Sequence, residues 1–259
     1  MVWKDRKRGN FWGRNDMNTF VLKLIACATM FIDHFTEIFI PQMGRLSHHA
    51  YGGISSVYLA GRLIGRIAFP IYCFLLVEGF FRTRDRRKYM ARMAVFALIS
   101  EFPFDLAFQV TGKQIRIREL FSYQNVMITL LLGLVLMYLY EWIKMKYLLQ
   151  PLIFNTLGVM AIVGIGYAAQ CLKTDYGMGG ILLIMVFYLF RGKKIWIFVG
   201  SALVFVFFVN ILELAGLFAF IPVFLYNGER GPKIKYAFYA FYPLHLLVLG
   251  GIGYWMYYL

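Results

Sequence analysis

The sequence has few charged residues and few cysteines. Charged side chains make up 15% of the 259 residues, against about 25% in an ordinary soluble domain, whereas hydrophobic residues reach 61%. The three cysteines, Cys27, Cys73 and Cys171, lack the spacing of metal ligands, and we expect them to be small apolar core residues. No repeat or low-complexity tract is found. This composition excludes an ordinary soluble domain and a cysteine-based metal site, and it indicates a protein that folds in lipid.

Long apolar runs are what the chain has in abundance. A helix needs roughly 20 mostly apolar residues to cross the hydrocarbon of a bilayer. Nine windows are predicted as spans: 20–40, 57–81, 89–110, 126–142, 152–172, 180–190, 195–209, 211–226 and 236–258. The sixth to eighth are short, so we expect nine spans, with eight as the alternative. The predicted fold is all-α, a polytopic transmembrane helix bundle.

Basic residues are distributed unevenly among the predicted loops. With the N-terminus inside, 18 of the 27 Lys and Arg residues lie in cytoplasmic segments and five lie in outer segments. Lys and Arg collect on the cytoplasmic side of membrane proteins, so we expect a cytoplasmic N-terminus. The net charge of +14 then reflects topology and contact with anionic lipid, and no nucleic-acid partner is expected. No cleavage signature follows the first window, so no signal peptide is expected.

Ionisable side chains within the predicted spans are the most informative feature. Each costs about 2.5–3.5 kcal/mol on insertion scales and therefore needs a partner or a function. They gather in the first, second, third and last spans, and they include Lys23, Asp33, His34, Glu37, Arg62, Arg66, Glu78, Glu101, Asp105 and His245. Most lie toward the outer ends of the spans, where Gln124 and Asn125 lead into the fourth span and Asp175 and Tyr176 precede the sixth. We therefore expect a polar site biased toward the outer leaflet.

Helical geometry places the ionisable groups of the first span on a shared side. Glu37 is three residues after His34 and four after Asp33, so all three can lie together. Lys23 is eleven residues before His34, and at 100° per residue it returns to within about 20° of the same face. Because an imidazole titrates near neutrality, His34 with its flanking carboxylates is the candidate general base.

The arginines of the second span have two possible roles. Arg62 and Arg66 form an i,i+4 pair, as do Glu101 and Asp105 in the third span, so the four groups could simply neutralise one another. Alternatively, the arginines serve the polar site. His245 in the last span is either a second proton-transfer group or a packing residue. Prolines beside these positions in the second, third and last spans free backbone carbonyls, which favours a polar cavity.

Several segments resemble, in order, the TraX family of membrane proteins. They are LKLIACATMFIDH (22–34), GRIAFPIYCFLLVEGFFRT (65–83), FALISEFPFDLAF (96–108), QNVMITLLLGL (124–134), DYGMGGILLI (175–184), YNGERG (226–231) and FYPLHLL (241–247). The resemblance covers nearly the whole chain after about Asn18, and the family pattern begins near Met17. We therefore expect a basic cytoplasmic extension (or a misassigned start) over 1–17 and a TraX-like transmembrane acyltransferase domain over 18–259.

The resemblance implies a multi-pass acetyltransferase of the bacterial plasma (inner) membrane. The founding member of the family is linked to acetylation of the N-terminal amine of conjugative pilin. The sequence also shows a looser resemblance to type-3 transmembrane acyltransferases, which carry a basic residue and a His with ten residues between them. Lys23 and His34 have this spacing, with Lys in place of Arg. Such enzymes move an acyl group from cytoplasmic acyl-CoA to an extracytoplasmic acceptor.

The implied reaction assigns two sets of residues. The predicted catalytic set is His34, Asp33, Glu37, Arg62, Arg66, Glu101, Asp105, Gln124, Asn125 and His245. The predicted residues for binding the cosubstrate acetyl-CoA are basic, and they are Lys23, Arg82, Arg84, Arg87, Arg230 and Lys233. No metal is expected.

Within the catalytic set, His34 has the central role. Oriented by Asp33 or Glu37, it acts as general base on the acceptor or carries the acetyl group. An arginine of the second span, with Gln124 and Asn125, stabilises the oxyanion of the tetrahedral intermediate. The acceptor is the amine or hydroxyl of an exported protein, pilin-like or otherwise, or of an envelope glycan or lipid.

Two other function classes fit the same residues. A proton-coupled transporter also needs intramembrane His, Asp and Arg side chains, although the sequence lacks the internal repeat of many transporters. A non-catalytic assembly factor for envelope proteins is the other alternative. Consumption of acetyl-CoA by the purified protein separates an enzyme from a transporter. The substitution His34→Ala separates it from an assembly factor, whose function would stay intact.

Overall fold

The computed structural model describes residues 17–46, 51–109, 122–232 and 234–258, and these ranges are almost entirely helical. The elements are α1 (Thr19–Leu46), α2 (Tyr51–Gly65), α3 (Ala68–Arg82), α4 (Arg86–Gln109), α5 (Val126–Tyr147), α6 (Pro151–Cys171), α7 (Gly177–Leu189), α8 (Lys194–Val204), the π-helix η2 (Phe205–Val209), the 3₁₀ helix η3 (Ile211–Ala219), α9 (Phe220–Phe224) and α10 (Lys235–Tyr258). Within the described ranges there is no strand, and a single isolated bridge joins Gln124 to Thr174. The all-helical prediction is therefore confirmed.

Five helices of the described chain are long and apolar enough to cross a membrane. They are Thr19–Pro41, Ser56–Arg82, Val126–Tyr147, Pro151–Cys171 and Tyr236–Met256. Three further apolar helices are shorter: Gly177–Leu189, Lys194–Val209 and Ile211–Phe224. The helix α4 covers the third predicted window but carries charges at both ends. The chain is thus a helical membrane protein, while nine spans and a cytoplasmic N-terminus remain predictions.

Local sequence explains where several helices begin and end. Asn18 caps α1, because its Oδ1 accepts hydrogen bonds from the backbone N–H groups of Phe20 (2.9 Å) and Val21 (3.1 Å). Asn125 caps α5 in the same way, accepting from Met127 N–H at 2.9 Å. Pro70 has no N–H to donate to the carbonyl four residues earlier, and the chain breaks between α2 and α3 at that point. The predicted second span is therefore one helical segment interrupted by a turn at Arg66 and Ile67, between α2 and α3.

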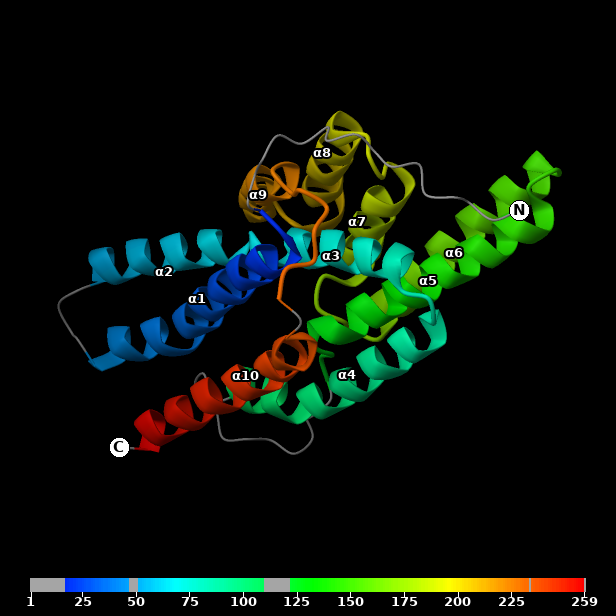
Figure 1. The fold of residues 1–259 in the computed structure, drawn as a ribbon. Helices are drawn as coiled ribbons and strands as arrows, with labels where there is room; N and C mark the ends of the chain where they lie inside the picture. The colour runs from blue at the N-terminus through cyan, green and yellow to red at the C-terminus, as the bar shows by residue number, and fades with distance from the viewer. Residues whose placement is uncertain (1–16, 47–50, 110–121, 233, 259) are drawn as a thin grey trace.

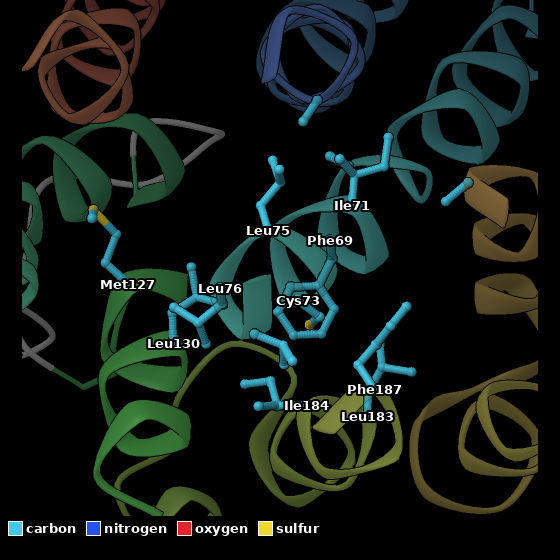
Figure 2. Close-up of a cluster of buried hydrophobic side chains, with 14 of the residues drawn as sticks. Phe69, Ile71, Cys73, Leu75, Leu76, Met127, Leu130, Leu183, Ile184 and Phe187 are labelled. Carbon is cyan, nitrogen blue, oxygen red and sulfur yellow. The ribbon is translucent and has the colours of Figure 1, made fainter. Parts of the chain in front are cut away.

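The helix α3 lies at the centre of the packed core. Buried residues of α3 face α5 on one side and α7 on the other (Figure 2), and the labelled set is Phe69, Ile71, Cys73, Leu75, Leu76, Met127, Leu130, Leu183, Ile184 and Phe187. The pairs α1–α2 and α4–α10 run side by side around it (Figure 1). In contrast, α6 leaves large apolar side chains such as Leu152, Val159 and Tyr167 exposed, as a lipid-facing helix does.

Two glycines allow α1 and α2 to approach closely. A Cβ atom at Gly61 would overlap the side chain of Thr36, and one at Gly65 would overlap the side chain of Asp33. The backbone of α2 therefore lies directly against the part of α1 that carries the predicted polar site.

Candidate active site

A cavity of about 210 Å³ lies where α1, α2, α3, α4 and the loop before α7 meet. Its ionisable lining residues are Asp33, His34, Glu37, Arg62, Arg66 and Asp175. Its aromatic lining residues are Phe69, Tyr72, Phe104, Phe108 and Tyr176. Five of the residues predicted from the sequence thus line one cavity, and Asp175 and Tyr176 join them.

Asp33 is the carboxylate that joins the two arginines. Its Oδ2 lies 2.9 Å from Nη1 of Arg62, and its Oδ1 lies 3.4 Å from Nη2 of Arg66. Arg62 Nη1 also lies 2.9 Å from Oε2 of Glu37, which accepts a hydrogen bond from the Tyr58 hydroxyl at 2.9 Å. The carboxylates of α1 therefore hold both guanidinium groups against the cavity.

Arg66 has a second anionic partner that the sequence prediction missed. Its Nη1 lies 2.7 Å from Oε1 of Glu213 and 3.5 Å from the hydroxyl of Tyr176. Glu213 is only 3% exposed, and Asn210 helps to position it by accepting a hydrogen bond from its backbone N–H at 3.3 Å. The signal in the sequence was a lone carboxylate in the apolar run of residues 211–221, since such a group needs a cationic partner.

The proposed structural pairing of the arginines with the third span is corrected by these contacts. Arg62 and Arg66 form ion pairs with Asp33, Glu37 and Glu213. The physical reason is proximity, because α2 packs directly against α1. Of the two acidic residues of the third span, Glu101 bonds to an asparagine, and Asp105 is buried on the same helix.

The second polar feature is a pair of histidines, of which His34 lines the cavity. Nδ1 of His34 lies 2.8 Å from Nε2 of His245, and the two ring planes are within 7° of parallel. Nδ1 of His245 in turn lies 2.7 Å from the carbonyl oxygen of Phe241. We predicted that Asp33 or Glu37 orients His34. The structure instead gives His34 a histidine as its hydrogen-bond partner, while both carboxylates are bonded to arginine.

The loop before α7 closes the cavity from another side. Tyr176 has a left-handed backbone, with φ at 65°, and its ring stacks on Phe69 with the centroids 3.7 Å apart. Asp175 donates its backbone N–H to the carbonyl of Gln124 at 2.9 Å. Burial raises the pKa of the Asp175 carboxyl to about 6, and the nearby charge of Arg66 acts in the opposite direction. A bulky residue in this backbone conformation is uncommon and marks the loop as a fixed part of the site.

Gln124 and Asn125 do not line this cavity. The side-chain amide of Asn125 donates to the carbonyl of Ala97 at 2.9 Å and to Glu101, while its oxygen caps α5 at Met127. The polar atoms of Asn125 are thus used to join α4 to α5. The structure assigns Asn125 and Glu101 to helix packing, and neither Gln124 nor Asn125 is among the residues that line the cavity with His34.

At the opposite end of α3, the predicted donor-binding arginines are in two different situations. Arg82 forms an i,i+4 ion pair with Glu78 at 3.2 Å and lies over the ring of Tyr226. Glu78 also binds Arg191 at 2.7 Å, and Arg230 donates to the carbonyl of Arg82 at 3.5 Å. Arg82 and Arg230 therefore hold neighbouring segments together.

Arg84 and Arg87 instead line an open basic hollow of about 660 Å³. The full lining set is Arg84, Asp85, Arg86, Arg87, Lys88 and Tyr138. The backbone N–H of Lys88 donates to Asp85 Oδ1 at 3.0 Å, which lowers the pKa of that carboxyl. Lys23 lies apart from this hollow, with Nζ 5.0 Å from the ring centroid of Phe238, and Lys233 lies outside the described residues.

Comparisons with known proteins agree with the resemblance seen in the sequence. The family model described as "TraX protein" matches residues 19–253. The chain is 29% identical over 261 residues to "Probable fimbrial assembly protein FimC, serogroup H1" of Dichelobacter nodosus, and the match covers 90% of this chain and 95% of that protein. No solved structure matches the chain.

Proposed function

Because the chain belongs to the TraX family, we propose that it is a membrane-embedded acetyltransferase. It moves an acetyl group from cytoplasmic acetyl-CoA to an amine or hydroxyl of an acceptor on the far side of the membrane. The protein lies in the bacterial plasma membrane as a multi-pass bundle of nine spans, with its N-terminus in the cytoplasm.

The observation that carries this proposal is that His34, Arg62 and Arg66 line one cavity. An imidazole can accept a proton from an attacking amine or hydroxyl. Two guanidinium groups, already held by carboxylates, can stabilise the negative charge that develops on the thioester oxygen. These are the two elements that acyl transfer requires.

The reaction proceeds by addition and elimination. The acceptor nitrogen or oxygen attacks the thioester carbonyl carbon, and His34 takes the proton that the acceptor loses. The tetrahedral intermediate then collapses as the carbon–sulfur bond breaks, and the leaving CoA thiolate takes the proton from the His34 imidazolium, which restores the neutral base. The new amide or ester bond remains on the acceptor, so atoms and charge balance.

The basic hollow suits the phosphates of the donor. Arg84 and Arg87 lie there with two further cations, and the hollow is open to solvent. The helix α3 connects this end to the cavity, and its 14 residue steps from Ala68 to Arg82 span about 21 Å. The acyl-bearing arm of acetyl-CoA must cover this distance between the helices.

The acceptor is best described as a group exposed on an exported molecule. The Dichelobacter relative is named as a fimbrial assembly protein, which favours the N-terminal amine of a pilin-like polypeptide. An envelope glycan or lipid amine is compatible with the same chemistry.

The test is acetyl transfer by the purified protein in lipid nanodiscs. Radiolabelled acetyl-CoA is supplied with an envelope extract to the wild type, to His34→Ala and to a matched control, Phe31→Ala, which shortens an exposed side chain of the same helix. We expect transfer by the wild type and the control, and a loss on the order of 10²-fold or more in His34→Ala. If the wild type neither binds nor consumes acetyl-CoA, the proposed function is wrong.

A non-catalytic assembly role is the second candidate, favoured by the name of the same relative. In that case the cavity would be an inert polar core. Fimbria-like assembly in cells, scored for the wild type and for His34→Ala, separates the two functions. An assembly factor keeps its function in the variant, and an enzyme loses it.

A further inference from the structure

Two hydrogen bonds connect the cavity to the backbone of α10. They run from Nδ1 of His34 to Nε2 of His245 (2.8 Å), and from Nδ1 of His245 to the carbonyl oxygen of Phe241 (2.7 Å). This chain of contacts has a direction, because its last member can only accept hydrogen bonds. The following inference rests on the proposed function of His34 as a base.

The direction fixes where the protons lie. Since a carbonyl oxygen cannot donate, Nδ1 of His245 must carry the proton of that hydrogen bond. A neutral imidazole has one N–H, so Nε2 of His245 is an acceptor, and Nδ1 of His34 must donate to it. Neutral His34 then has its lone pair on Nε2.

The neutral form of His245 fits its surroundings. Its side chain is 6% exposed, and its ring stacks on Phe241 with the centroids 4.6 Å apart. No carboxylate of the described chain forms an ion pair with His245, and a buried cation without such a partner is costly. Its hydrogen-bond partners include the Phe241 carbonyl and His34, and its ring packs against the ring of Tyr242.

The remaining nitrogen of His34, Nε2, is suitably placed to accept a proton. His34 lines the cavity, and its Nε2 forms no hydrogen bond with any residue that the structure describes. The edge of the ring also packs against Phe108, with the centroids 5.2 Å apart, which restricts rotation. An unprotonated nitrogen in a fixed ring is what a general base requires.

We propose that His245 is a positioning residue that holds His34 in the Nδ1–H tautomer, so that Nε2 of His34 is the base. In the reaction, the proton lost by the acceptor moves to Nε2 of His34 and forms an imidazolium. The Nδ1–H of His34 stays bonded to His245 throughout. No proton passes to His245, which distinguishes this role from the second proton-transfer group considered from the sequence.

Two substitutions separate positioning from proton transfer. A glutamine at 245 keeps an amide oxygen that can accept from His34 and an amide N–H that can donate to Phe241, but it does not titrate. We expect His245→Gln to retain kcat within about threefold, with an unchanged pH profile, and His245→Leu to lose on the order of 10²-fold. If glutamine is as inactive as leucine, His245 must titrate and the proposal is overturned. Wild-type rates in His245→Leu overturn it as well.

The tautomer is also measured directly, without turnover. Nitrogen NMR of the full-length protein, with ¹⁵N-labelled histidine and recorded at pH 8.5, distinguishes protonated from bare ring nitrogens; His34→Gln and His245→Gln spectra assign the signals. We expect His34 to carry its proton on Nδ1 in the wild type and in His245→Gln. A proton on Nε2 in the wild type overturns the proposal, even if His245→Leu fails to fold. If the wild type shows no acetyl transfer, the proposed function fails, while this spectrum still decides the tautomer.

Discussion

The two ends of α3 carry cationic groups in opposite situations. At the cavity end, the side chain of Arg66 is 15% exposed and contacts two carboxylates from different elements. At the basic hollow, Lys88 is 78% exposed, and its partner Asp85 lies 3.5 Å away on the same short turn. One end has a guanidinium group fixed in direction by long-range packing, and the other has charges exposed to solvent.

The difference separates two uses of positive charge. A buried cation whose partners fix its geometry can stabilise an oxyanion at a defined position, because the groups need no rearrangement during the reaction. Exposed cations act mainly as a field that attracts an anionic ligand, and salt screens that field. The cavity end therefore suits the chemical step, and the hollow suits capture of the donor.

Of the substitutions considered, the one at Arg66 is expected to reduce stability most. Replacing Arg66 by Met leaves Glu213 buried without its cation, and breaking such a pair costs about 3–5 kcal/mol. We expect the free energy of unfolding in detergent to fall by this amount. The double variant Arg66→Met/Glu213→Met should recover most of the loss, because no unpaired charge remains at Glu213. A loss below about 1 kcal/mol in the single variant would place Arg66 in the same class as the exposed cations.

The second-largest effect is expected from Asp175, in the loop between α6 and α7, which makes the free energy of unfolding depend on pH. Its folded pKa of about 6 exceeds the ordinary value of 3.8, so the native state binds the proton more tightly than the unfolded state does. The stabilisation is present below pH 4 and is lost as the pH rises through 6. Relative to the wild type, Asp175→Asn should therefore gain on the order of 2 kcal/mol between pH 4 and pH 8.

Unfolding at both pH values checks this prediction, with Arg66, Arg62 and Asp33 unchanged in both proteins. Asp85→Asn is the matched control from the basic hollow. Hydrogen bonding by Lys88 lowers the pKa of Asp85, so its pH trend has the opposite sign. Parallel curves for the wild type and Asp175→Asn would show that Asp175 keeps its ordinary pKa.

A smaller effect is expected where α2 approaches α1. Gly61→Ala and Gly65→Ala place a methyl group against Thr36 and Asp33, and overpacking costs about 1–3 kcal/mol. Alanine is a better helix former than glycine by about 1 kcal/mol, so the net loss is on the order of 1 kcal/mol. Gly164→Ala on α6 is the control, since its added methyl meets no atom within 4 Å, and it should be neutral or stabilising. Equal thermal shifts for the three variants would contradict the close packing.

Much of the helical fold could be predicted from the sequence, because apolar runs and prolines act locally. Each predicted window is helical in the structure, although the second is divided between α2 and α3, and the seventh and eighth each contain two helical elements. The sequence does not show which short helices cross the bilayer. That depends on packing against neighbours, as in the irregular segment η2–η3, where a π-helix gives way to a 3₁₀ helix at Asn210.

In the candidate site, too, some features could be predicted from the sequence and others could not. The residue types and depth of His34, Arg62 and Arg66 were sufficient to predict one polar cluster. Their partners were not predictable, because Glu213 and His245 come from segments more than 140 residues further along the chain. Spacing within one helix favoured the carboxylates next to His34, whereas the packing of α10 against α1 provides a histidine.

The smallest effects are expected at the basic hollow, and they test the other half of the comparison. Arg84→Gln and Arg87→Gln should change the free energy of unfolding by less than about 0.5 kcal/mol, as for exposed charges generally. In the acetyl-transfer assay, each should raise KM for acetyl-CoA a few-fold at low salt without lowering kcat, and the effect should diminish as salt increases. Lys144→Gln, an exposed cation of α5 outside the hollow, is the control and should leave KM unchanged. A fall in kcat with KM unchanged would mean that these arginines serve the chemical step, and the assignment of separate tasks to the two ends of α3 would be wrong.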